Sequence, residues 1–299
     1  MNGIIIVKKE KGFTSHDVVA KLRGILHIKK IGHTGTLDPD AVGVLPVCVG
    51  KATKVCDLLT DKDKTYVAEV KLGVTTDTLD LTGEVLTEND ATVSEDDVRE
   101  ALAHFHGEIR QIPPMYSAIK INGKKLYELA RQGIEVERKA RTVTIHELLL
   151  WEVDLEKQEF TIEVSCSKGT YIRSLCHDIG EVLGCGAVMK SLVRTRVGRF
   201  DLGQARTLAE IEESVQAGET GNLLLPVDSV FDSYRRCQAD TTAMKFLSNG
   251  NLIKPSLCTV DEPKADEQVR MYGADGEFYA IYRYDAKDKM YHIVKMFHE

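Results

Sequence analysis

The chain has 299 residues, of which 43% are hydrophobic and 28% charged, and its formal net charge is −7. This balance is typical of a globular protein with one large domain and a smaller one, because the chain exceeds the size of one usual core. No apolar run approaches the ~20 residues of a membrane helix, and the first lysines follow the apolar residues 3–7, which indicates a strand and no signal peptide.

The cysteines indicate a reducing environment. They number seven, an odd count, and form neither a CxxC pair nor a Cys/His metal spacing. We therefore expect reduced thiols, a cytoplasmic location, and neither a structural zinc nor a disulfide framework.

Charge is unevenly distributed along the chain. Lysine and arginine gather in residues 8–54 and 110–141, whereas acidic residues gather in 77–108 and 210–219. A basic face on an acidic body would suit a polyanionic partner, but ordinary solvated lysines explain the same pattern. Charge alone does not choose between these interpretations.

Hydrophobic periodicity and turn residues predict a mixed α and β chain. The predicted elements begin with a strand at 3–8, a helix at 17–26 capped by 14–17, a loop at 32–46, a strand at 44–49, a helix at 51–59, a strand at 64–73, a polar turn region at 74–83 and a helix at 94–105. They continue with an extended segment at 111–120, a hairpin turn at 121–124, a helix at 126–132, strands at 141–150 and 159–166, a turn at 168–173, a helix at 174–183, and the segments 187–197 and 223–230. From residue 233 onward, short alternating segments at 269–272, 278–283 and 291–297 predict a small β-rich domain.

The loop at 32–46 carries the strongest functional signal. Its glycines permit positive φ, and Pro39 biases the preceding Asp38 toward a turn or extended conformation, so this carboxylate is held in one direction. An ordinary Asx turn would explain a lone Asp-Pro. It would not explain the neighbouring His33 or the lysines that follow at 51 and 54. Asp38 and Asp40 also match the DxDx[TV] pattern of haloacid-dehalogenase-type phosphatases, although no apolar strand precedes Asp38.

Two other segments offer partners for such a carboxylate. Arg173 follows a Gly-Thr-Tyr turn and could orient a carboxylate by a charge-assisted pair. Tyr66 lies on a predicted strand and could stack on a base. Each residue has a commoner structural role, and the pattern alone does not bring either one near Asp38.

Together these segments resemble the TruB family, the bacterial tRNA pseudouridine-55 synthases. Gly-His-Thr-Gly-Thr-Leu-Asp-Pro at 32–39 resembles the family's signature loop, and Lys-Thr-Tyr at 64–66 with Leu-Gly at 72–73 and Thr-Asp-Thr at 76–78 resembles its second motif. Gln-Ile-Pro-Pro at 111–114 with Ser-Ala-Ile-Lys at 117–120 resembles the family's insert, and Cys-Ser-Lys-Gly-Thr-Tyr-Ile-Arg at 166–173 resembles its third motif. The resemblance spans residues 3 to 230.

The resemblance implies an α+β fold. A pseudouridine synthase-type catalytic domain at 1–232, with a mixed, mostly antiparallel sheet, would carry an insert at about 108–146 that contacts RNA. A small β-rich, PUA-like RNA-binding domain at 233–299 would follow. The active site would lie in a cleft of the first domain.

The same resemblance implies an isomerase that converts uridine 55 in the TΨC loop of tRNA to pseudouridine, without metal or cofactor. Asp38 would be the nucleophile on a flipped-out nucleotide, with Arg173 as its partner and Tyr66 stacked on the uracil. The substrate-binding residues implied are His33, Tyr171, Leu192 and Lys9. Where the family has proline after this lysine, the chain has Glu10, which bears on Lys9 and not on the nucleophile.

Several alternatives stay open. A non-catalytic RNA-binding or tRNA-folding protein on the same scaffold would not need Asp38, and a metal-dependent phosphatase would need Mg²⁺. The sequence does not decide whether Asp38 attacks C1′ or C6, whether other RNAs are modified, or whether the C-terminal domain is required. The expected state is a monomer without membrane contact or an obligate protein partner.

Overall fold

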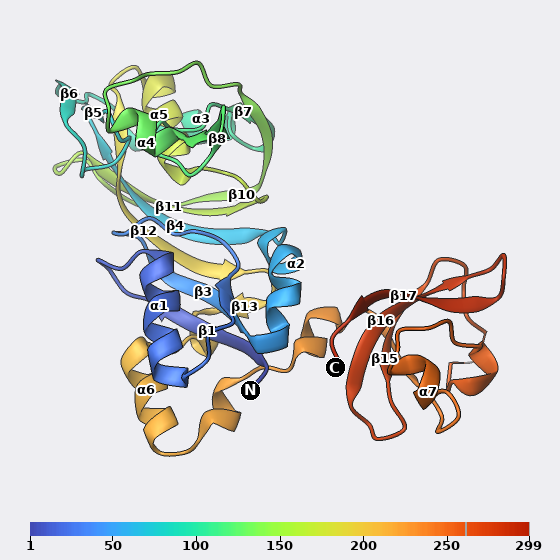
Figure 1. The fold of residues 1–299 in the computed structure, drawn as a ribbon. Coiled ribbons are helices and arrows are strands. Elements are labelled where there is room, and N and C mark those ends of the chain that lie inside the picture. The colour runs from blue at the N-terminus through green and yellow to red at the C-terminus, as the bar shows by residue number, and fades with distance from the viewer. Residues whose placement is uncertain (261, 299) are drawn as a thin grey trace.

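The computed structural model describes residues 1–260 and 262–298, and in this part of the chain a nine-stranded sheet forms the centre (Figure 1). The strand order is β1-β3-β12-β4-β11-β10-β7, with β2 paired to β3 and β13 paired to β12. Within the described residues, only the β3–β12 pairing of this sheet is parallel. The predicted fold class, α+β with a mixed and mostly antiparallel sheet, is confirmed.

The strands of the central sheet have these bounds: β1 (Gly3–Lys9), β2 (Ile31–His33), β3 (Val42–Val49), β4 (Lys64–Leu72), β7 (Gly107–Gln111), β10 (Arg141–Asp154), β11 (Glu159–Cys166), β12 (Ala187–Val197) and β13 (Phe200–Asp201). The α-helices are α1 (Ser15–Leu26), α2 (Cys56–Thr60), α3 (Glu95–Ala103), α4 (Leu126–Ala130), α5 (Ile172–Leu183), α6 (Leu208–Gln216) and α7 (Met244–Leu247). The 3₁₀ helices, labelled η, are η1 (Gly50–Val55), η2 (Leu202–Gln204), η3 (Thr220–Leu223), η4 (Val227–Phe231) and η5 (Pro255–Leu257).

Helices cover the two ends of the sheet. At one end α1 and α6 pack on β1 and β3 around Leu22 and Ile211, and at the other α3 and α5 pack on the strands β4, β10, β11 and β12. Local signals start these helices as predicted: Thr14 caps α1 through a capping box with Asp17. The largest core therefore lies between α5 and the strands beside it.

The sequence patterns missed several elements. Residues 31–33 were expected inside a loop but form β2 on the edge of β3, and the predicted helix at 51–59 is a 3₁₀ turn that continues as the short α2. The polar region at 74–83 contributes β5 (Val74–Thr76), which pairs with β6 (Val85–Glu88). The strand β7 and the helix α6 were not predicted. The missed strands are short and pair with distant or polar partners, so they lack a clear period of their own.

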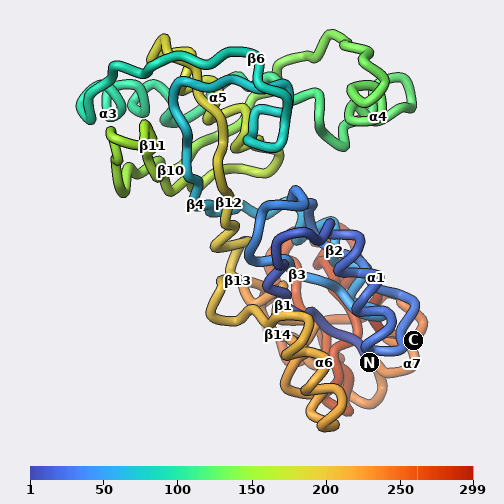
Figure 2. The backbone as a smooth tube through the Cα atoms, turned by 90° about the vertical axis from the view of Figure 1, so that its left-hand side faces the viewer, coloured from blue at the N-terminus to red at the C-terminus, as the bar shows by residue number. Residues whose placement is uncertain are grey.

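An insert between β7 and β10 has a small core of its own. The hairpin β8 (Lys120–Ile121) and β9 (Lys124–Lys125) leads into α4, and Met115, Leu126 and Leu129 are buried together. The sequence patterns correctly gave the extended start, the turn and the helix of this segment. Figure 2 shows the insert projecting from the body on the same side of the molecule as α1 and β2.

The C-terminal part forms a separate β-rich unit. Its sheet has the order β14 (Arg235–Gln238), β15 (Gln268–Tyr272), β16 (Phe278–Asp285) and β17 (Met290–Met296), and it encloses its own core. Phe231, Phe278 and Phe297 pack together where this unit meets the part of the chain before residue 233. The expected domain 233–299 includes residues 261 and 299, which lie outside the described residues. No helix in the described part of the chain is long and apolar enough to cross a membrane.

Candidate active site

The loop between β2 and β3 presents Asp38 at the surface while its flanks are buried. Leu37 and Ala41 are 4% and 2% exposed and belong to the main core, whereas the side chain of Asp38 is 39% exposed. The loop is tied down from outside: the Leu37 amide donates to Ser15 Oγ at 2.9 Å. The carboxylate is thereby held in a fixed position that remains open to a ligand.

Arg173, the second residue of α5, binds this carboxylate through two nitrogens of its guanidinium. Its Nε lies 3.0 Å from Asp38 Oδ2, and its Nη2 donates to Asp38 Oδ1 at 3.3 Å. Such a two-point pair fixes both the position and the plane of the carboxylate.

The remaining donors of Arg173 hold two further segments. Nη1 donates to the Thr78 carbonyl at 2.9 Å and Nη2 to the Tyr116 carbonyl at 2.7 Å, while Asp80 Oδ2 lies 3.8 Å from Nε. The side chain of Arg173 is only 6% exposed, so these partners replace the water that the buried cation has lost. One guanidinium therefore joins the Asp38 loop, the turn after β5, the insert and α5.

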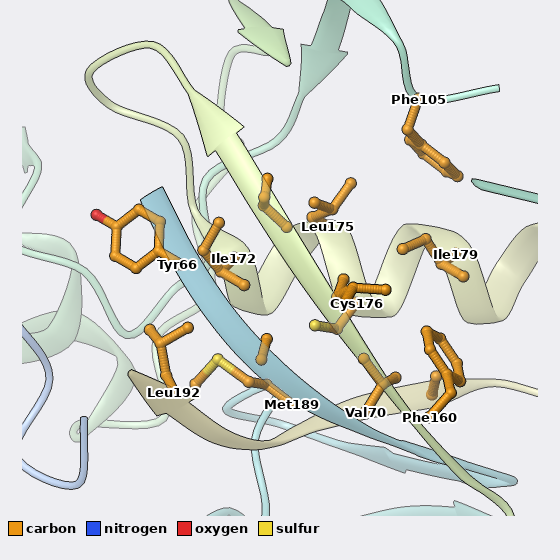
Figure 3. Close-up of a cluster of buried hydrophobic side chains, with 14 of the residues drawn as sticks. Tyr66, Val70, Phe105, Phe160, Ile172, Leu175, Cys176, Ile179, Met189 and Leu192 are labelled. Atoms are coloured by element: carbon orange, nitrogen blue, oxygen red, sulfur yellow. The ribbon is translucent and has the colours of Figure 1, made fainter. Parts of the chain in front are cut away.

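Leu37, the neighbour of Asp38 in the chain, belongs to an apolar cluster that contains two predicted site residues. Tyr66 on β4 and Leu192 on β12 are each 8% exposed and share a cluster with Leu37 and Ile172. Figure 3 shows Tyr66 and Leu192 at one end of this cluster, with the Tyr66 hydroxyl directed away from it. Burial raises the pKa of Tyr66, which keeps the phenol protonated at neutral pH.

Tyr171 is fixed at the start of α5. Its amide donates to Gln111 Oε1 at 2.7 Å, and Gln111 Nε2 donates to the Tyr171 carbonyl at 3.0 Å. The Tyr171 ring is half-buried, and burial raises its pKa. Gln111, the last residue of β7, thus links this strand to the start of α5 beside Arg173.

His33 lies at the beginning of the same loop but contacts the loop backbone. Its Nδ1 accepts from the Gly35 amide at 3.3 Å, and its ring meets that of His16 edge to face at 5.2 Å. Burial, followed by the neighbouring His16 and Arg194, lowers the pKa of His33, so the imidazole is neutral at pH 7.

Lys9 lies beneath the loop and not in the open site. It is 1% exposed, and its Nζ donates to the carbonyls of Pro39 at 3.0 Å and Glu10 at 3.1 Å. Burial lowers the pKa of Lys9 to about 8. The side chain of Glu10 is exposed, and its backbone carbonyl supplies one of the two acceptors.

The phosphatase interpretation finds no support in this geometry. Asp38 follows the irregular residues 34–37 and does not end a buried strand. Asp40 is exposed and lies 4.0 Å from Lys11. The two carboxylates are therefore in different surroundings, and only Asp38 is held by a buried cation.

The structure adds residues that the sequence analysis missed. Arg194 is 1% exposed and contacts the Asp38 loop, and Asp80 lies beside Arg173. Strand alternation could have found Arg194, because it puts residue 194 on the same inward face as the predicted pocket residue Leu192.

A cavity of about 670 Å³ lies next to this site, between the β5–β6 hairpin, the insert and the C-terminal end of α5. Its lining includes Tyr116, whose carbonyl binds Arg173, but not Asp38. One group with metal-ligating side chains occurs in the described residues, at Asp285, Asp288 and His292. Asp285 ends β16, Asp288 lies in the turn that follows, and His292 lies on β17, where it pairs with Asp288 at 2.7 Å; both carboxylates accept backbone amides.

Comparison with known proteins identifies the family of this chain. The family model for the TruB family pseudouridylate synthase N-terminal domain matches residues 23–172, and that for the tRNA pseudouridylate synthase B C-terminal domain matches residues 173–232. The chain is 56% identical to tRNA pseudouridine synthase B of Lachnoclostridium phytofermentans over 306 residues, covering 99% of this chain and all of that protein. It is 50% identical to the protein of the same name in Listeria monocytogenes, covering 89% of each.

Solved structures with a similar fold are less similar to this chain in sequence. The fold is similar to a chain in the structure of an H/ACA RNP bound to a substrate RNA containing 2′-deoxyuridine, with a TM-score of 0.72, 26% identity, and coverage of 99% of this chain and 85% of the other. A chain of the Cbf5-Nop10-Gar1 complex also gives a TM-score of 0.72, with 28% identity over 99% of this chain and 84% of that one.

Proposed function

Because the chain belongs to the TruB family of pseudouridylate synthases, we propose that it isomerises uridine 55 in the TΨC loop of tRNA to pseudouridine. The observation that carries this proposal is the two-point pair between Asp38 and Arg173, on a loop whose Leu37 packs in one cluster with Tyr66 and Leu192. The names of the relatives support tRNA as the substrate, and the resemblance of the signature loop supports position 55.

In this proposal Asp38 is the nucleophile. Arg173 holds the carboxylate in one orientation, so the reacting oxygen needs no rearrangement before it attacks. During the reaction the bond between N1 and C1′ breaks, the base turns, and C5 forms a new bond to C1′. The hydrogen at C5 is released, and neither a redox step nor a metal is required.

The other site residues receive the flipped-out nucleotide. Tyr66 stacks on the uracil as a protonated phenol, while Leu192 and Tyr171 line the pocket. His33 takes up space beside the extruded nucleotide as a neutral imidazole. We assign Lys9 an indirect part in binding, because its buried ammonium supports the Pro39 carbonyl next to Asp38. A uridine inside a folded loop must leave its stack to reach Asp38, and stacking on the pocket walls offsets that loss.

We further propose that the insert at about 108–146 clamps the T-arm. It carries exposed basic side chains and lies on the same side of the molecule as α1, which adds more of them (Figure 2). These are Lys120, Lys124, Arg131 and Lys139 on the insert, Arg110 and Arg141 on the strands β7 and β10 that flank it, and Lys21 and Arg23 on α1. Residues 1–232 would form the catalytic domain and 233–299 a PUA-like domain that also binds RNA.

The cysteines of the described chain are free thiols, which supports the cytoplasm as the place where the enzyme works. We propose a monomer that acts without an obligate protein partner or cofactor.

Mapping the modified nucleotide tests the proposal. Purified protein is incubated with an unmodified tRNA transcript, and pseudouridine is located by carbodiimide labelling and primer extension. We expect one new stop, reporting position 55, that disappears in a matched transcript carrying cytidine 55. A stop at a different uridine, or none from a folded tRNA, would contradict the proposed specificity.

A further inference from the structure

Arg194 is a buried cation without a carboxylate partner. It lies on β12, is 1% exposed, and has no acidic side chain within ion-pair distance among the residues that the structure describes. Its acceptors are instead backbone carbonyls: Nε donates to Val44 at 2.7 Å, Nη1 to Thr36 at 3.4 Å, and Nη2 to Gly35 at 3.4 Å.

These three carbonyls lie on both sides of Asp38. Gly35 and Thr36 precede the carboxylate, and Val44 follows it at the start of β3. The planar guanidinium has five donors in a fixed fork, which allows one side chain to bind acceptors on both sides of a loop. The contacts of Arg194 therefore close the base of the loop that carries Asp38.

The backbone of Arg194 reaches the same loop. Residue 194 pairs with Gly43 in the parallel ladder, and a Cβ at Gly43 would lie 2.2 Å from the Arg194 carbonyl oxygen. Gly43 also has φ +112°, a conformation that residues with a side chain rarely adopt. The close packing of β12 on the end of the loop thus requires glycine at position 43.

Arg194 also lies against Tyr66. The two residues are directly opposite each other in the β12–β4 ladder, so their side chains share one face of the sheet. The Arg194 guanidinium and the Tyr66 phenol lie close enough to interact electrostatically. Lys9 and Lys64, which are 1% and 7% exposed, lie close enough for charge interactions with Arg194.

We propose that Arg194 is a positioning residue, which fixes the loop bearing Asp38 relative to Tyr66 and thereby sets the distance between nucleophile and stacking platform. This inference rests on the proposed pseudouridine synthase activity. Arg194 binds the carbonyls of the loop and lies opposite Tyr66 in the sheet, so it acts through the Asp38 loop and Tyr66 and not on the nucleotide itself. A displacement of about 1 Å in such a site costs on the order of 100-fold in rate.

The test compares Arg194→Lys and Arg194→Met with wild type in single-turnover reactions, using enzyme in excess over tRNA transcript tritiated at uracil C5. Lysine keeps the charge but cannot reach three carbonyls at once, and methionine keeps the volume without charge. Thermal melting reports the folded fraction, and filter binding reports the Kd for tRNA. Arg196→Lys is the matched control, because Arg196 is an exposed arginine of the same strand.

The proposal predicts that both Arg194 variants melt cooperatively, bind tRNA within about threefold of wild type, and convert the tRNA fully but about 100-fold more slowly. Arg196→Lys keeps the wild-type rate constant. A variant with reduced amplitude but a normal rate constant would show that Arg194 only supports folding, and this would overturn the proposal.

The proposal also falls if both variants react at the wild-type rate, or if neither melts cooperatively. An inactive wild-type enzyme would instead refute the proposed function, so the two failures can be told apart.

Discussion

Asp38 and Arg173 meet although 135 positions separate them in the chain. Arg173 is buried and Asp38 is partly exposed. The carboxylate is therefore accessible to a ligand, whereas the positive charge that pairs with it is not. Lys9 supports the same loop from below through the Pro39 carbonyl. At the scale of single residues, the site therefore consists of one accessible anion held by buried cations.

The burial of Lys9 predicts a pH dependence of stability. Its pKa is about 8 in the folded protein and about 10.5 in an unfolded chain, because burial disfavours the ammonium. Between these values the unfolded state binds more protons, so the contribution of Lys9 to the free energy of unfolding rises with pH above about 8. Below pH 8 both states are protonated and the cost of burial is constant.

The measurement is urea unfolding of wild type and Lys9→Met at pH 7 and pH 9. Relative to the variant, wild type should gain about 1 kcal/mol between the two pH values. Lys64, whose pKa is also lowered to about 8, is present in both proteins and cancels in the difference. Parallel pH profiles for the two proteins would contradict this account of Lys9.

The Asp38 loop is the element on which the site depends, and its two ends are fixed by different strands. β2 pairs with β3 before the loop, and β12 abuts Gly43 after it. The helix α5 supplies Arg173, which pairs with Asp38 on this loop. Because three elements hold one short loop, its conformation should tolerate few substitutions at the points of close approach.

Gly43→Ala tests that tolerance. The new Cβ would collide with the Arg194 carbonyl, and the positive φ would be strained, so we expect a loss of about 2–4 kcal/mol in the free energy of unfolding. The matched control is Gly24→Ala in α1, where a Cβ meets no atom within 4 Å. Alanine should stabilise that helix by about 0.5–1 kcal/mol. Equal effects of the two variants in urea unfolding would show that the contact between β12 and the loop is not tight.

The insert gives a prediction for RNA binding. Lys120 and Lys124 are exposed on the β8–β9 hairpin, where each could neutralise a phosphate of the T-arm. Replacing both by glutamine should reduce the steepness of log K against log salt by about 1.5, because fewer counterions are released on binding. The control is Lys157→Gln, in the turn between β10 and β11, which should leave the slope unchanged. An unchanged slope in the double variant would place the RNA contacts elsewhere.

At the scale of the whole molecule, the sequence predicted the elements whose periodicity is strong and local. The capping box at Thr14 and the strand containing Tyr66 lie where the pattern indicated, and the helix predicted at 174–183 begins two residues earlier, at Ile172. The short strand β2 and the β5–β6 hairpin were missed, because their pairing depends on distant strands or polar residues.

The site itself was predicted mainly through the family resemblance, since no periodicity relates Asp38 to Arg173. The roles of Arg194 and of the Thr78 and Tyr116 carbonyls could not be predicted from residue type. A buried arginine and a backbone oxygen acquire meaning only when the strands carrying them are packed together.

The most direct test of the central claim is tritium release from tRNA labelled at uracil C5, measured for wild type and Asp38→Asn side by side. Bond formation between C5 and C1′ must expel that hydrogen. The account predicts release by wild type and none by Asp38→Asn, with the variant still binding tRNA. Absence of release by wild type on a well-folded tRNA would contradict catalysis and favour a non-catalytic RNA-binding or tRNA-folding protein, and release by Asp38→Asn at the wild-type rate would contradict the nucleophile.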